Sequence, residues 1–182
     1  MGNVDKELVH AAMRGNRSAM ADLYSRNIGY LTAVCSRYLA DNDDRNDVLQ
    51  NSFVKIFSAL GSFEYRGEGS LKAWMARIVV NEALKYLKNA GRISTVPEDR
   101  IPDIADGEEP EVDDIPQPVL QDMIRQLPDG YRTVFNLFVF EEKSHKEIAS
   151  MLGITESTSA SQFHRARKIL ADKIMEYRKS IG

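Results

Sequence analysis

The stretch LPDGYRTVFNLFVFEEKSHKEIASMLGIT, residues 127–155, carries the pattern of a turn followed by two short helices. Its strongly apolar run from 131 to 140 predicts the first helix. Ser144 is a good N-cap for the second, and Glu147 stands at the third position after it, as in a capping box. Gly153 can adopt the positive φ that a tight turn into another helix needs. The stretch therefore predicts a helix-turn-helix.

A longer helix is predicted to follow, from Thr155 to about Tyr177. One face of it carries side chains able to reach base edges and phosphates, and another carries apolar side chains that can pack inward. The predicted outer face holds Thr158, Ser161, Gln162, Arg165 and Lys168, and the inner face holds Phe163, Ile169, Leu170 and Ile174. This division predicts a DNA-reading helix near the C-terminal end of the sequence.

Residues 96–118, VPEDRIPDIADGEEPEVDDIPQP, differ in composition from the rest of the chain. They hold nine acidic side chains, one basic side chain and five of the six prolines. Proline removes backbone donors and the dense negative charge opposes burial, so we expect a flexible acidic linker. It separates a domain of residues 1–95 from one of residues 119–182. Extended, roughly 20 residues reach about 65 Å, nearly two turns of B-DNA.

Residues 1–95 have the apolar periodicity of helices and no alternating run rich in Val, Ile and Thr. We expect helices over about 17–39, 45–60 and 70–88, with Ser70 as the N-cap of the third. That third helix bears a polar, mostly cationic stripe made of Arg77, Asn81, Lys85 and Lys88. The sequence thus predicts an all-α protein of two small helical domains joined by a flexible acidic linker, the C-terminal one a helix-turn-helix.

The composition excludes several other classes of protein. The 182 residues carry a net charge of -3, one cysteine and three well-separated histidines, which excludes an internal disulfide and a cysteine-rich zinc cage. No apolar run approaches the roughly 20 residues of a membrane span, and the polar start is unlike a signal peptide. The sequence has no phosphate-binding glycine loop, nucleophile beside a histidine or metal-spaced carboxylates. We expect a cytoplasmic protein without enzymatic activity, cofactor, small-molecule substrate or membrane insertion.

Four motifs in a fixed order carry a resemblance to a known family. They are RYLADNDDRNDVLQNSFVKIFSAL (37–60), FEYRGEGSLKAWMARIVVNEALKYLK (63–88), the stretch 127–155 and HRARKIL (164–170), with the acidic linker before the third. In this order the chain resembles an extracytoplasmic-function (ECF) sigma factor of the sigma-70 family. The resemblance implies a protein that binds core RNA polymerase, carries it to promoter DNA and helps to open the duplex. It also implies control by an anti-sigma factor.

The resemblance assigns roles to residues in three sets. The polymerase-binding set is Asp44, Asp47, Gln50, Asn51 and Phe53. The minus-ten set, for recognition and melting, is Phe63, Tyr65, Arg66, Trp74, Arg77, Asn81 and Lys85. The minus-thirty-five set is Thr158, Ser161, Gln162, His164, Arg165, Arg167 and Lys168. Melting requires a base to leave the stack, and aromatic side chains beside basic ones can hold an extruded base and its backbone.

Structural roles compete with these assignments at several positions. Phe53 is as well explained as a core residue, and Trp74 is better explained as one. The carboxylates of the first set can be helix caps, and the basic residues from 164 to 168 can be a solvated face near a helix C-terminus. Lys85 departs from the family, where an acidic residue is common. The family's Gly, Val, Lys and Arg are replaced in the recognition helix by Ser157, Ser159, Ala160 and Gln162.

Two other functions compete with that of a sigma factor. A DNA-binding regulator that acts without polymerase would leave the DVLQNSF segment and the aromatic loop unexplained. A sigma-mimicking module that sequesters an anti-sigma protein is favoured by the reduced number of cations in the recognition helix. The stripe on the third helix and the basic HRARK segment speak against it, because both suit DNA binding.

Overall fold

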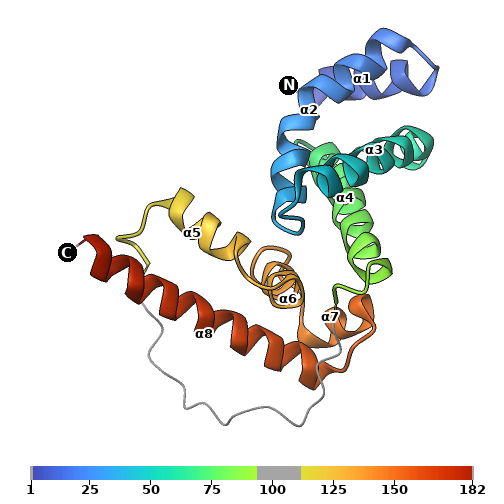
Figure 1. The fold of residues 1–182 in the computed structure, drawn as a ribbon. Coiled ribbons are helices and arrows are strands. Elements are labelled where there is room, and N and C mark those ends of the chain that lie inside the picture. The colour runs from blue at the N-terminus through green and yellow to red at the C-terminus, as the bar shows by residue number, and fades with distance from the viewer. Residues whose placement is uncertain (1, 94–111, 182) are drawn as a thin grey trace. The chain divides into compact units, whose positions relative to one another are not determined.

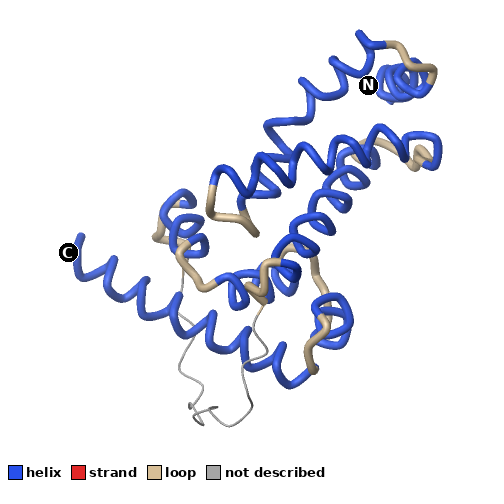
Figure 2. Tube along the Cα trace, turned by 45° about the vertical axis from the view of Figure 1, so that its right-hand side comes forward, coloured by secondary structure: helices blue, strands red, loops and turns tan. Residues whose placement is uncertain are grey.

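The computed structural model describes residues 2–93 and 112–181, and its ribbon consists of helices and loops in both ranges (Figure 1, Figure 2). The all-α prediction is therefore confirmed. The chain divides into two compact units, Met1–Tyr86 and Leu87–Gly182. Within the described ranges, no helix has both the length and the apolar character that a membrane span requires.

The first unit contains helices α1 (Gly2–Met13), α2 (Arg17–Ser36), α3 (Asn42–Ala59) and α4 (Ser70–Asn89), with a 3-10 turn, η1 (Leu60–Ser62), after α3. α1 packs along α2, and α2 packs against α3. The three predicted helices are present with shifted ends. α3 begins at Asn42 rather than at 45 because the Asp41 side chain accepts hydrogen bonds from the backbone N–H groups of Asp43 and Asp44, at 2.9 and 3.0 Å.

Ser70 is the first residue of α4 and not its N-cap, so that prediction is wrong. Its hydroxyl donates to the carbonyl oxygen of Gly67 at 2.7 Å and accepts from the N–H of Arg66 at 3.3 Å. Gly67 and Gly69 have positive φ values of 116° and 81°, which favour glycine at both positions. The Ser70 side chain therefore stabilises the loop before α4 instead of capping the helix.

The core of the first unit is apolar along the facing sides of α2, α3 and α4. Its most deeply buried side chains include Leu23, Leu31, Tyr38, Leu39, Ile56, Leu60 and Met75. Cys35 lies in the same core with no exposed surface, and burial raises the pKa of its thiol to about 12. The thiol is therefore protonated at neutral pH and inaccessible to reagents.

The second unit contains α5 (Gln117–Arg125), α6 (Asp129–Val139), α7 (His145–Leu152) and α8 (Glu156–Ile181). The predicted helix-turn-helix is confirmed as α7, a turn and α8. Ser144 and Glu147 form the capping box at the start of α7, and Gly153 ends that helix with φ of +71°. α8 runs four residues beyond the predicted end at 177.

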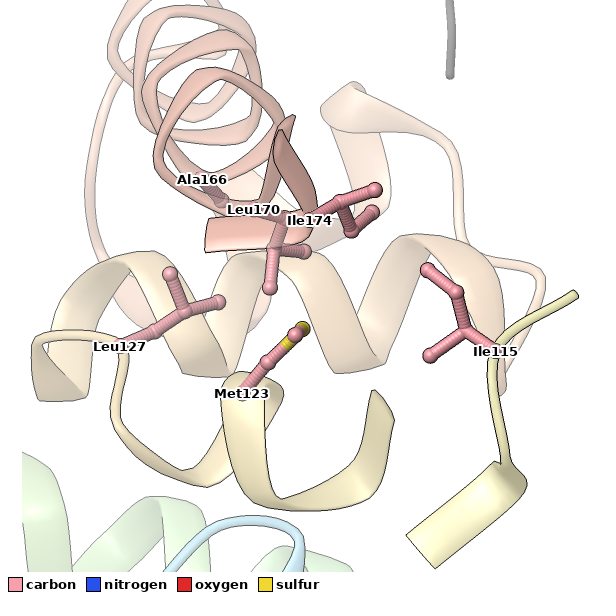
Figure 3. Packing of buried hydrophobic residues seen from close by; sticks show 6 residues of the cluster. All are labelled: Ile115, Met123, Leu127, Ala166, Leu170 and Ile174. Carbon is pink, nitrogen blue, oxygen red and sulfur yellow. The ribbon is translucent and has the colours of Figure 1, made fainter. Parts of the chain in front are cut away.

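The predicted linker ends too late in the chain. Ile115 is buried with Met123, Leu127, Ala166, Leu170 and Ile174 in the core between α5 and α8 (Figure 3). Beside it, the guanidinium of Arg178 donates to Asp114 at 2.7 and 3.1 Å, which lowers the pKa of that carboxyl. Residues 112–118 therefore belong to the packed unit, because Ile115 gains burial there and Asp114 gains an ion partner. Residues 94–111 lie outside the described residues.

A buried arginine organises the turn between α5 and α6. Arg132 is only 3% exposed, and its Nη1 donates to the carbonyl oxygens of Arg125 and Leu127 at 2.8 and 2.9 Å. Its Nη2 donates to the Asp129 carboxylate. Burial lowers the pKa of Arg132, although an arginine stays protonated at neutral pH. The turn at 127–130 is thus held from inside the unit.

Candidate functional site

The exposed side of α3 carries three members of the polymerase-binding set. Asp47, Gln50 and Asn51 are all solvent-exposed and follow one another at helical spacing. Val54, one turn further, is 66% exposed and extends the same face. The sequence does not mark Val54 as a surface residue, because an apolar residue at helical spacing indicates core rather than surface. These four residues are hereafter the α3 stripe.

The other two members of that set have structural partners. Phe53 is 5% exposed, and its ring lies 4.6 Å from Tyr24 and 6.0 Å from Phe57, measured between centroids. Its assignment to a contact surface is therefore not supported, and the competing core role explains it. Asp44 is half-buried and accepts a hydrogen bond from the Tyr86 hydroxyl on α4. It joins two helices of the unit.

The loop before α4 brings two aromatic members of the minus-ten set together. The rings of Phe63 and Trp74 are 5.3 Å apart and tilted by 50°, and both side chains are half-buried. Each therefore has one side packed and one side at the surface. Tyr65 is also half-buried, whereas Arg66 is exposed and pairs with Glu64 at 3.0 Å. This exposed ion pair contributes little to stability, so Arg66 can exchange Glu64 for another anion.

The cationic stripe on α4 is exposed as predicted. Arg77, Asn81 and Lys85 recur at intervals of four residues and are all exposed. Within the described part of the chain, none of the three is held by an ion pair or by a side-chain hydrogen bond. Two cations and an amide are thus available on one helix face next to the Phe63–Trp74 pair. That arrangement suits a phosphate backbone and an unstacked base.

Gln162 does not lie on the outer face of α8, so that part of the prediction is wrong. It is 2% exposed and packs under the first turn of α6, where a Cβ atom on Gly130 would lie 3.4 Å from its Oε1. A long amide side chain fills the space that a glycine in the neighbouring helix leaves open. Gln162 therefore cannot reach a base edge in this structure.

Four other members of the minus-thirty-five set, Thr158, Ser161, Arg165 and Arg167, are half-buried and have partners within the unit. The Thr158 hydroxyl pairs with Thr155 at 2.7 Å, and Ser161 Oγ donates to the carbonyl oxygen of Ser157 at 2.9 Å. Arg165 Nη1 donates to Tyr131 Oη at 3.1 Å. Arg167 lies over the Phe163 ring at 5.9 Å, His164 is half-buried, and Lys168 is exposed.

The structure also shows what holds α8 in place. His145 at the start of α7 has its Nδ1 3.0 Å from Oγ of the fully buried Ser159, and its ring stacks on Phe138 at 4.7 Å. Phe138 in turn lies 4.4 Å from Phe163, whose predicted inward packing is consistent with these contacts. The sequence gives no sign of this inward role for Ser159, since short polar residues in a recognition helix are expected to face outward.

Comparison with known proteins places both units in one family. Residues 23–93 match the family described as Sigma-70 region 2, and residues 118–170 match Sigma-70, region 4. The ECF RNA polymerase sigma-E factor of Haemophilus influenzae is 30% identical, over 93% of this chain and 95% of that protein. The RNA polymerase sigma-H factor of Pseudomonas aeruginosa is 29% identical, over 94% of each. A solved structure of CnrH in complex with the cytosolic domain of CnrY is 23% identical, with a TM-score of 0.48 over 94% of this chain and 97% of that chain.

Proposed function

Because the chain belongs to the ECF branch of the sigma-70 family, we propose that it binds core RNA polymerase, directs it to specific promoters and helps to melt the DNA. Sigma factors are transcription initiation factors rather than enzymes. One observation carries the proposal: sigma regions 2 and 4 occur in order along one chain, and each contains exposed polar helix surface. An anti-sigma factor as a partner and a cytoplasmic location are part of the proposal.

The α3 stripe is the surface that we assign to polymerase. Its two amides and one carboxylate can bond a polar partner helix, and the exposed Val54 adds apolar area. Phe53 supports this surface from inside, and Asp44 helps to hold α3 against α4. Replacing Asp47 and Gln50 together by alanine should therefore weaken polymerase binding and leave the fold intact. Asp22→Ala is the control, because Asp22 is also an exposed carboxylate but lies on α2, outside the α3 stripe.

The face built from Phe63, Trp74, Arg77, Asn81 and Lys85 is assigned to the minus-ten element. Tyr65 and Arg66 in the adjoining loop complete it. The half-exposed aromatic pair offers a stacking surface for an extruded base, and the cations follow the strand's phosphates. Asn81→Ala should impair opening more than initial binding, since the Watson–Crick edge of a base becomes available to an amide only after the strands separate.

The minus-thirty-five element is assigned to the start and middle of α8. The residues retained for it are Thr158, Ser161, His164, Arg165, Arg167 and Lys168, and Gln162 is withdrawn because it is buried. Arg165 is the strongest candidate for base reading, since a guanidinium can bond a guanine edge through two N–H groups. Arg165→Ala should weaken upstream binding and lower its salt dependence.

Reconstituted transcription tests the proposal directly. Core RNA polymerase from the source bacterium is incubated with a promoter library, with and without the full chain. Co-elution of the chain with core polymerase is tested separately by gel filtration. Transcripts that depend on the chain and initiate at defined sequences are the expected result. Stable capture of an anti-sigma protein, with neither transcripts nor co-elution with polymerase, would instead establish a sigma mimic. DNA binding without polymerase would establish an independent regulator.

A further inference from the structure

We infer that Tyr131 is a positioning residue for Arg165, and that its hydroxyl aims the guanidinium of the recognition helix at the upstream promoter element. The inference rests on the proposed function, in which Arg165 contacts DNA. It adds a residue from α6, outside the recognition helix, to the determinants of sequence preference. The juxtaposition that carries it is the 3.1 Å hydrogen bond from Arg165 Nη1 to Tyr131 Oη.

The tyrosine ring is held by apolar packing. Tyr131 is half-buried and packs against the apolar cluster that contains Leu127, Ala166 and Leu170. Ala166 directly follows Arg165 and has no exposed surface, so the helix backbone at this point is pressed against the same cluster. A ring packed in this way has few alternative rotamers, and its hydroxyl occupies a defined position relative to the backbone of α8.

The bond acts on orientation and not on charge. An unbound arginine side chain samples many rotamers, and fixing it in one of them on DNA binding costs conformational entropy. The Tyr131 hydroxyl accepts one of the five guanidinium N–H donors, so the cation and its planar geometry are retained. Arg165 is thereby restricted before DNA arrives, which lowers the cost of a bidentate base contact and leaves phosphate attraction unchanged.

The roles of Arg165 and Tyr131 can therefore be separated by mutation. Loss of Arg165 removes a cation and a base contact together. Loss of the Tyr131 hydroxyl removes only the orientation. A residue that merely stabilised the unit would instead affect all DNA contacts of α8 alike, since all of them depend on the same fold.

The test uses holoenzyme assembled with the full chain and a promoter library randomised upstream of the start site, with transcripts read by sequencing. The variants are Tyr131→Phe, Arg165→Ala and both together. Tyr177→Phe is the control, because Tyr177 is also half-buried against the same cluster but lies twelve residues from Arg165, about 18 Å along α8. Thermal unfolding of each variant checks that the fold is retained.

Arg165→Ala should abolish base preference at one or two adjacent positions and reduce the salt slope of binding by about 1. Tyr131→Phe should lower preference at those same positions by about three- to tenfold and leave the salt slope unchanged. The double variant should match Arg165→Ala, and Tyr177→Phe should match the wild type.

Three results would overturn the inference, each with a distinct meaning. If Arg165→Ala changes preferences and Tyr131→Phe does not, Tyr131 has no positioning role and the proposed DNA contact stands. If Tyr131→Phe weakens preference at every upstream position, or adds fully to Arg165→Ala, its role is structural. If Arg165→Ala changes nothing, the assignment of Arg165 to DNA is wrong, and the inference falls with it.

Discussion

Helices α4 and α8 present the same kind of sequence, polar residues at helical spacing, and use it in different ways. On α4, Arg77, Asn81 and Lys85 are exposed and project from one face. On α8, Gln162 is buried and Arg165 is bonded to another helix. The contrast teaches that a polar stripe predicts a binding face only where the neighbouring helices leave that face open.

The physical reason lies in how many helices cover each one. α8 packs against α5, α6 and α7, and two polar side chains on its packed side, Ser159 and Gln162, are buried. In the described residues the second unit buries Arg132, Thr133, Asn136, Ser159 and Gln162, whereas the first buries only Asn27 and Ser52 among polar residues. Buried polar groups need partners inside the protein. The second unit therefore uses more of its polar side chains for internal hydrogen bonds than the first unit does.

Removal of Arg132 should have the largest effect on the stability of the second unit. Arg132→Ala would leave the carbonyl oxygens of Arg125 and Leu127 without their donor and the Asp129 carboxylate without its cation, at a cost of about 3 to 5 kcal/mol. Trp74, the single tryptophan, lies in the first unit, so its emission reports that unit while circular dichroism reports both.

We therefore expect Arg132→Ala to lose part of its circular-dichroism helix signal at a lower urea concentration than the wild type. The midpoint of the Trp74 fluorescence transition should stay unchanged. Arg125→Ala is the control, because its side chain is 46% exposed and it should change stability by less than about 0.5 kcal/mol. An unchanged helix transition in Arg132→Ala would show that the buried guanidinium is dispensable.

Two amides, the buried Gln162 and the exposed Asn81, test whether burial distinguishes the polar residues of α8 from those of α4. Gln162→Ala should destabilise the second unit by about 1 to 3 kcal/mol, since it leaves a cavity beneath α6 and removes a buried amide. Asn81→Ala should stay within about 0.5 kcal/mol of wild type, because Asn81 is exposed. Thermal and urea unfolding measure both. Equal stability of the two variants would refute the distinction between a packed and an open polar face.

Backbone strain in the second unit allows a smaller test in the opposite direction. Glu142, in the turn between α6 and α7, has a φ of 52°, and among described residues it is the non-glycine residue with positive φ. Glu142→Gly should stabilise the unit by about 1 kcal/mol because glycine adopts this conformation without steric cost. Differential scanning calorimetry checks the sign. A lower melting temperature would mean that the loss of unfolded-state restriction outweighs the relief of strain.

The smallest expected effect is the loss of stability of the helix-turn-helix at low pH. Hydrogen bonds from the Ser144 backbone and hydroxyl lower the pKa of Glu147, whose ordinary value is about 4.3. A depressed folded-state pKa gives stabilisation that is complete above about pH 4.3 and disappears as pH falls through the folded value. The Ser144 amide resonance should titrate with a midpoint below 4.3, and Glu147→Gln, which preserves the capping box, should abolish that titration. A titration midpoint of the Ser144 amide resonance at or above about 4.3 would contradict the hydrogen bonds between Ser144 and Glu147.

The contrast between the two helices also shows where sequence reasoning succeeded. The helix-turn-helix followed from local signals, namely a capping box at Ser144 and a glycine at 153, and both are present. Phe53 and Gln162 were placed on contact surfaces and are buried, because their neighbours Tyr24 and Gly130 come from other helices. Ile115 was assigned to a linker because one apolar residue in an acidic, proline-rich segment gives no periodic pattern. In the structure it is buried in the core between α5 and α8.

The helical class, the order of the motifs and the family can be read from the sequence, because caps, turn glycines and apolar periodicity act between residues close in the chain. The sequence also placed Arg77, Asn81 and Lys85 on one exposed face. Only the tertiary structure decided which polar residues of α8 remain at the surface and which of them meet Tyr131 or Gly130. Helical spacing states which residues share a face, whereas burial depends on the helices packed against it, and those are distant in sequence.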